Sequence, residues 1–96
     1  MTSPWGKVQH TTPVASGIVF LETASHGGYY LTPDQNERIS LVWRKASFNG
    51  NGLRGFYEED CDWSMVCLAF PDLFPPDALL SAKTVFKNFH ADLLTI

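Results

Sequence analysis

The chain has 96 residues, of which 45% are hydrophobic and 14% are aromatic. A chain of this length supports one hydrophobic core, so we expect a single domain over residues 1–96, and the apolar content excludes a disordered segment. The net charge of −3 excludes the general basic surface of a nucleic-acid-binding protein. An acidic balance fits solubility or a basic partner.

The first part of the chain favours antiparallel strands. Residues 5–11 ("WGKVQHT") alternate loosely, and residues 17–24 ("GIVFLETA") form a run rich in β-branched and aromatic side chains. The Gly27-Gly28 pair then predicts a hairpin turn before residues 29–31, because glycine accepts the positive φ of tight turns.

Helical signals begin at Thr32, which is a candidate N-cap. Pro33 suits the first helical position and Gln35 suits the capping box, so we expect a helix over residues 33–45. The segment "SFNGNGLRG" at 47–55 is rich in glycine and asparagine and predicts a mobile loop that leads into a short strand at 53–57.

Two further helices complete the pattern. Residues 61–70 are apolar on nearly every side and predict a buried central helix that ends at Pro71, and a second helix restarts after residue 76. The expected core residues of these helices are Trp63, Val66, Cys67, Phe70, Leu79, Phe86 and Phe89. The whole pattern predicts an α+β fold, in which an antiparallel sheet of three or four strands from the N-terminal half packs against two or three helices.

The two cysteines, Cys61 and Cys67, do not suit a disulfide. On one helix they would point to different sides, too far apart to form a bridge. Neither belongs to a C-x-x-C pair, so the spacing predicts neither a zinc site nor another cofactor. With no leader segment and no apolar run near 20 residues, we expect a cytoplasmic protein with reduced thiols and no membrane contact.

Residues 58–62 contain an unusual concentration of acid. The carboxylates are Glu58, Glu59, Asp60 and Asp62. In the opening turn of the central helix, one or two of them would stabilise the unpaired N–H groups, each by about 0.3–1 kcal/mol. Four exceed that need, because like charges one turn apart repel. The surplus predicts a surface that binds a basic partner protein, and the candidates to extend it are Glu22, Asp34 and Glu37.

A catalytic use of the same acids is the main alternative. A metal-dependent enzyme requires converging carboxylates, whereas consecutive helix positions point outward, so we expect no metal ligand and no catalytic residue. A small metal- or acid/base-dependent enzyme would use His26, from the hairpin, with Glu58, Glu59 or Asp60, although a histidine in a turn more often makes local hydrogen bonds.

Three blocks of the sequence resemble a known family. They are "SPWGKVQHTT" at 3–12, "GIVFLETASHGGYYLT" at 17–32 and "GFYEEDCDWSMVCLAFPDLF" at 55–74. They are similar to a small uncharacterised domain of phage and plasmid proteins with the pattern P-W-G, T-A-x-H-G-G and W-Y-E-E-D-C-x-W. Phe56 stands where that family usually has tryptophan. The resemblance implies a mobile-element setting and transfers no activity. It also implies a possible paired site of His26 and Tyr57, in which His26 meets the acids across the fold.

In size and charge the chain also resembles anti-CRISPR inhibitors, several of which mimic DNA. That resemblance implies a non-catalytic inhibitor in the host bacterial cytosol. It would bind a CRISPR surveillance complex, type I in preference to others, through its acids and block DNA recognition. We expect a monomer or small homo-oligomer that makes no direct contact with nucleic acid. An accessory interaction domain of larger plasmid proteins is the remaining alternative.

Overall fold

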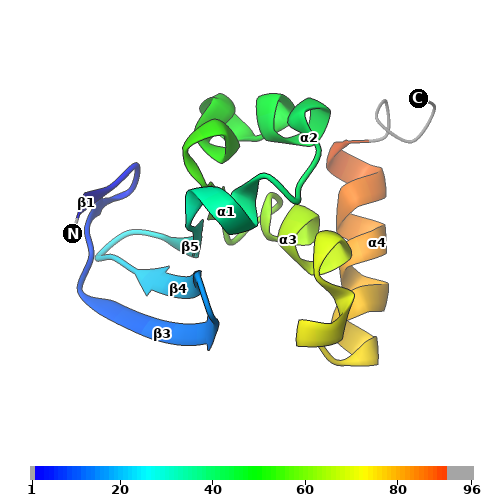
Figure 1. Ribbon diagram of the computed structural model, residues 1–96, viewed down its shortest axis with the longest axis horizontal. Coiled ribbons are helices and arrows are strands. Elements are labelled where there is room, and N and C mark those ends of the chain that lie inside the picture. The colour runs from blue at the N-terminus through cyan, green and yellow to red at the C-terminus, as the bar shows by residue number, and fades with distance from the viewer. Residues whose placement is uncertain (1, 91–96) are drawn as a thin grey trace.

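The computed structural model describes residues 2–90 and has the α+β fold that the sequence predicts. The strands are β1 (Thr2–Ser3), β2 (Gly6–Lys7), β3 (His10–Ala15), β4 (Ile18–Glu22), β5 (Gly27–Leu31) and β6 (Phe56–Glu58). The α-helices are α1 (Pro33–Asn36), α2 (Leu41–Ala46), α3 (Trp63–Ala69) and α4 (Pro76–Phe89), and the 3-10 helices are η1 (Phe48–Arg54) and η2 (Pro71–Leu73). The strands lie at one end of the molecule and α4 at the other, with α3 between them (Figure 1).

The main sheet is antiparallel, with the strand order β3-β4-β5-β6, and β1 and β2 form a separate small hairpin. The core-facing side of the central strands carries Ile18 and Leu31, which pair across β4 and β5, whereas Leu21 is buried on the opposite face of the sheet. The outer strand β3 contains Pro13, and its register against β4 shifts between Pro13 and Ala15. None of the helices in the described part of the chain has the length and apolar character to cross a bilayer.

The predicted glycine turn is wrong, because Gly27 and Gly28 lie inside β5. The hairpin turn precedes them, and the Thr23 hydroxyl closes it by accepting the N–H of His26 at 3.1 Å. A Cβ atom on Gly28 would collide with the Trp5 ring and the Tyr57 carbonyl. Glycine is therefore required here for close packing rather than for a positive φ.

The predicted helix over 33–45 is broken into α1 and α2. Pro33 does stand at the start of α1, but Gln35 donates to the Ser16 carbonyl at 2.7 Å and makes no capping box. A new helix begins at Ser40, whose hydroxyl accepts the N–H of Trp43. The break lets Ile39, between the two helices, enter the core.

Residues 47–55 form η1 and its cap instead of the predicted mobile loop. The Ser47 hydroxyl accepts the N–H of Gly52 at 2.7 Å, and the Asn36 amide donates to the Gly52 carbonyl at 2.8 Å. Gly55 then adopts a φ of 90°, which favours glycine, and the chain enters β6. The predicted strand at 53–57 is real but begins at Phe56.

Helices α3 and α4, with Phe70 just after α3, contribute most of the remaining core. Val66, Cys67, Phe70 and Phe86 are buried as predicted. Trp63 and Leu79 are only partly buried. The prediction for Phe89 is wrong, because its side chain is 64% exposed at the end of α4.

Candidate functional site

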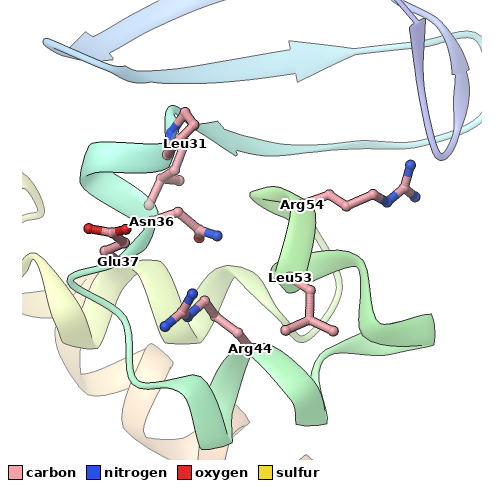
Figure 2. Close-up of a pocket in the computed structure, with 7 residues that line it drawn as sticks. Leu31, Asn36, Glu37, Arg44, Leu53 and Arg54 are labelled. Carbon is pink, nitrogen blue, oxygen red and sulfur yellow. The ribbon is translucent and has the colours of Figure 1, made fainter.

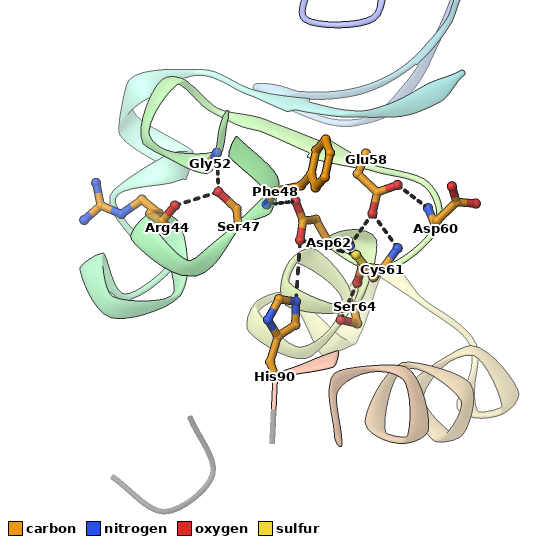
Figure 3. A network of polar contacts seen from close by, with 10 residues as sticks. All are labelled: Arg44, Ser47, Phe48, Gly52, Glu58, Asp60, Cys61, Asp62, Ser64 and His90. Carbon is orange, nitrogen blue, oxygen red and sulfur yellow. Dashed lines mark hydrogen bonds and ion pairs between the residues drawn. The ribbon is translucent and has the colours of Figure 1, made fainter. Parts of the chain in front are cut away.

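The acidic run occupies the turn between β6 and α3, not the first turn of a helix as predicted. Glu58 is the last residue of β6, and α3 begins at Trp63 without a carboxylate in its first turn. The Glu58 carboxylate accepts the backbone N–H groups of Asp60 at 2.8 Å and Asp62 at 2.9 Å, and also that of Cys61. Glu58 therefore holds the shape of this turn (Figure 3).

Asp62 is the most buried of the four acids, with 1% of its surface exposed. Its Oδ2 accepts the N–H of Phe48 at 2.7 Å, which ties the turn to η1. Its Oδ1 lies 3.5 Å from Nε2 of His90 and 3.8 Å from Sγ of Cys61 (Figure 3). Asp62 thus belongs to the interior and contributes nothing to an acidic surface.

The interior environment shifts the pKa values of this cluster. Burial raises the pKa of the Asp62 carboxyl above its usual range, even though the Phe48 N–H and His90 oppose the shift. Burial and the neighbouring Glu58 and Asp62 carboxylates raise the pKa of the Cys61 thiol strongly. Partial burial also acts on Glu58, but the hydrogen bonds that it accepts outweigh burial and lower its pKa.

The other two acids, Glu59 and Asp60, are exposed. A Cβ atom on Gly27 would lie 2.6 Å from Oε2 of Glu59, so this carboxylate lies directly over β5. Glu22, at the end of β4, pairs with Gly27 in the sheet. As a result Glu22 and Glu59 line one pocket of about 230 Å³.

His26 stands between two pockets. It lines the first with Glu22 and Glu59, and it lines a second pocket of about 380 Å³ with Glu58 and Asp60. The other residues of this second pocket are Trp5, Phe48, Cys61 and Phe89. We call Glu22, His26, Glu59 and Asp60 the acidic corner. No lysine or arginine is among the described residues that line either pocket.

Tyr57 does not join His26 at the acidic corner. Its side chain is fully buried, and its hydroxyl donates to the Asn36 side-chain oxygen and approaches the Gly52 carbonyl at 3.3 Å. Burial raises the pKa of Tyr57, so the phenol stays protonated. Tyr57 therefore acts as a core residue that joins β6 to α1 and η1.

Asp34 and Glu37 lie far from the acidic corner. Asp34 belongs to α1 and Glu37 is the residue that caps its end, and α1 follows the opposite end of β5, about 14 Å along a strand of this length. Glu37 lines a pocket of about 260 Å³ together with Arg44 and Arg54 (Figure 2). The mixed charge of this pocket separates it from the acidic corner.

Sequence reasoning missed the involvement of His90 and the burial of Asp62. His90 is the residue after α4, and its ring packs against Phe86 with the ring centroids 5.4 Å apart. No local pattern marks it, because its partners come from a distant turn. Only the packing of α4 against α3 brings His90 to Asp62.

Comparison with known proteins identifies a family but no activity. Residues 1–95 match the family described as a domain of unknown function, DUF7007. The chain belongs to this family. No curated protein and no solved structure matches it. Membership in the DUF7007 family agrees with the expected uncharacterised domain and assigns no activity to the chain.

Proposed function

We propose that this DUF7007 chain is a non-catalytic interaction domain that binds a basic surface of a partner protein through the acidic corner. The observation that carries this proposal is the convergence of Glu22 and Glu59, from separate segments, on one pocket with His26. The backbones of both residues are fixed, Glu22 within β4 and Glu59 by its N–H, which donates to the Gly27 carbonyl at 3.0 Å. A guanidinium or ammonium group can therefore bind two carboxylates that line the same pocket.

The neighbouring apolar pocket extends this surface. Trp5, Phe48 and Phe89 line it beside Asp60. Protein interfaces combine an apolar centre with a charged rim, and aromatic side chains are enriched among the residues that dominate affinity. A partner that presents arginine or lysine next to an apolar side chain fits both parts of this surface.

The specific partner that we propose is a CRISPR surveillance complex, with type I as the first choice. The resemblance to phage and plasmid domains supports this partner, and so does the acidic character of the chain. A groove that binds DNA carries arginine and lysine, and carboxylates on a compact domain compete for those side chains. The chain would then block DNA recognition without touching nucleic acid.

Binding to a purified type I surveillance complex tests the proposal. Because Asp62 is buried, charge reversal is placed on the exposed pair, as Glu22→Lys with Glu59→Lys. This variant should bind at least about tenfold more weakly, and its affinity should depend less on salt. The matched control is Asp34→Lys with Glu37→Lys, which reverses the same charge at the other end of β5 and should bind as wild type.

Two results would contradict the proposal. One is wild-type chain that does not bind the complex at low salt. The other is a Glu22→Lys/Glu59→Lys variant that remains folded by circular dichroism and binds as tightly as wild type. Capture of a larger plasmid-encoded protein instead of the complex would identify an accessory domain.

An acid/base enzyme is a second candidate, because His26 shares the apolar pocket with Glu58 and Asp60. Glu58 is a poor base, since its carboxylate already accepts three backbone N–H groups. Titration separates the two candidates. A binding inhibitor inactivates one surveillance complex per chain, whereas an enzyme inactivates many, and His26→Gln would abolish that turnover.

A further inference from the structure

A cluster of three different donor atoms lies behind the acidic corner. Cys61, Asp62 and His90 each offer one ligand atom, and these three atoms all lie within 4.8 Å of one another. The first two residues come from the turn before α3 and the third from the end of α4 (Figure 3). The function proposed above uses none of these atoms.

His90 supports a ligand role, because its Nε2 atom is buried and has no hydrogen-bond partner among residues 2–90. The residue is 8% exposed, and Nε2 makes no hydrogen bond within the described part of the chain. A buried polar nitrogen without a partner destabilises the fold by about 1–3 kcal/mol. This nitrogen faces Asp62 Oδ1 and Cys61, so a ring nitrogen that makes no hydrogen bond points into the cluster and is available as a metal ligand.

The spacing fits a shared ion better than a direct ion pair. A hydrogen bond between an imidazolium and a carboxylate brings the two heavy atoms to about 2.7–2.9 Å. In a tetrahedral zinc site, ligand atoms at about 2.0–2.3 Å from the metal are separated by about 3.3–3.6 Å. The His90–Asp62 distance of 3.5 Å falls within this range. The Cys61–Asp62 distance of 3.8 Å is slightly longer, and Cys61 lies within 4.8 Å of His90.

The surroundings of the cluster position the ligands. Asp62 Oδ2 is held by the N–H of Phe48 at 2.7 Å, which leaves Oδ1 available. Metal-binding carboxylates are commonly oriented by such hydrogen bonds. Glu58 is not available as a ligand, because backbone N–H groups occupy its carboxylate oxygens. Cys61 is half-buried and lines the apolar pocket, which gives an ion a path from solvent.

We propose that Cys61, Asp62 and His90 bind one divalent transition-metal ion of the zinc class. A set of sulfur, nitrogen and oxygen donors matches Zn²⁺, while Mg²⁺ and Ca²⁺ prefer oxygen ligands alone. Binding replaces the thiol proton of Cys61, which passes to solvent. The three protein ligands leave the fourth tetrahedral position to water. The ion joins the end of α4 to the turn that carries Glu59 and Asp60.

Titration of the metal-free chain with Co²⁺ and Zn²⁺ tests this site. Co²⁺ reports both the geometry and the ligands, because a thiolate–cobalt bond gives a charge-transfer band and a tetrahedral site gives visible absorption. We expect both signals at one equivalent of Co²⁺ and their loss when Zn²⁺ is added. Zn²⁺ should also raise the melting temperature, because it binds the folded chain.

Variants assign the ligands. Cys61→Ser should abolish the charge-transfer band, and His90→Gln should weaken Zn²⁺ binding at least about tenfold. The matched controls are Cys67→Ala, which removes the other thiol, and His10→Gln, which removes an exposed imidazole. Both controls should bind Zn²⁺ as wild type does.

Thiol alkylation of the wild-type chain gives a test that does not depend on how the variants fold. Zn²⁺ should slow the alkylation of Cys61, as located by mass spectrometry. The proposal is wrong if Co²⁺ gives no charge-transfer band, if Cys61→Ser retains it, or if Zn²⁺ leaves the alkylation of Cys61 unchanged. The Asp62–His90 contact would then be a simple buried ion pair.

Discussion

Among the four acids of residues 58–62, the two inner acids, Glu58 and Asp62, are at least partly buried, and the two outer acids, Glu59 and Asp60, are exposed. The two pairs differ in what they contact. Glu58 and Asp62 accept backbone hydrogen bonds that fix the turn and tie it to η1. Glu59 and Asp60 are exposed and line pockets. Four carboxylates of similar chemistry therefore serve two purposes, and burial separates them. The count of charges alone overstates how many can reach a partner.

The phenylalanines of α4 divide in the same way. Phe86 is 1% exposed and contacts Trp43 with the ring centroids 4.6 Å apart, whereas Phe89 is 64% exposed and lines the apolar pocket. Parallel substitution of a buried and an exposed residue, among the acids and among the phenylalanines, tests directly whether burial decides their contribution to stability.

The largest effect should come from Phe86→Ala. Truncating a buried phenylalanine removes its contacts and leaves a cavity, so the free energy of unfolding should fall by about 3–5 kcal/mol. Since a domain of this kind is stable by about 5–15 kcal/mol, this loss is severe. Urea unfolding measures it, and Phe89→Ala is the control, with an expected change within about 0.5 kcal/mol. Equal losses in both variants would contradict the assigned faces of α4.

Asp62→Ala should be the next most damaging change. It leaves the Phe48 N–H buried without an acceptor and removes the carboxylate that lies 3.5 Å from His90 Nε2, at a cost of about 3 kcal/mol. The metal-free chain should be used, so that loss of an ion does not contribute. Asp60→Ala is the matched control. A loss below about 1 kcal/mol for Asp62→Ala would show that water replaces the carboxylate.

Glu58→Ala should have an intermediate effect. Three backbone N–H groups lose their acceptor, but the residue is only partly buried and water can reach the turn. We expect a loss of about 1–2 kcal/mol, similar to the removal of a helix cap. Hydrogen exchange at the amides of Asp60, Cys61 and Asp62 should accelerate, and unchanged exchange there would exclude the capping role of Glu58.

The smallest change in stability should follow Glu59→Ala, because its carboxylate is exposed. We expect the free energy of unfolding to stay within about 0.5 kcal/mol of wild type. Binding to a basic partner should nevertheless weaken, because the pocket loses one of its two glutamates. A loss of stability with unchanged binding would reverse the division between inner and outer acids.

Much of the fold follows from local pattern. The run at 17–24, rich in β-branched and aromatic side chains, contains β4, and the apolar run at 61–70 contains α3. The break at Ser40 and the order in η1 depend on side-chain hydrogen bonds that compete with a continuous helix or a loop. Such competition is decided by three-dimensional neighbours, which a local window does not contain.

The site was less predictable than the fold. The acids were visible in the sequence, but the burial of Asp62 depends on Phe48 and His90, which reach it from other elements. The two glycines illustrate the same difficulty. "GG" usually marks a turn, while Gly28 is present because Trp5 and Tyr57 pack against its backbone. Contacts between residues distant in the sequence produce no periodic pattern in the sequence.

Pro13 and the register shift in β3 affect whether the strands of two copies of this chain can pair at this edge of the sheet. Pro13 has no N–H to offer, and the irregularity between Pro13 and Ala15 interrupts the row of backbone groups at that edge of the sheet. An outer strand of this form is a poor template for the addition of another strand. This edge therefore resists fibril growth, and contacts through side chains are favoured over backbone pairing there.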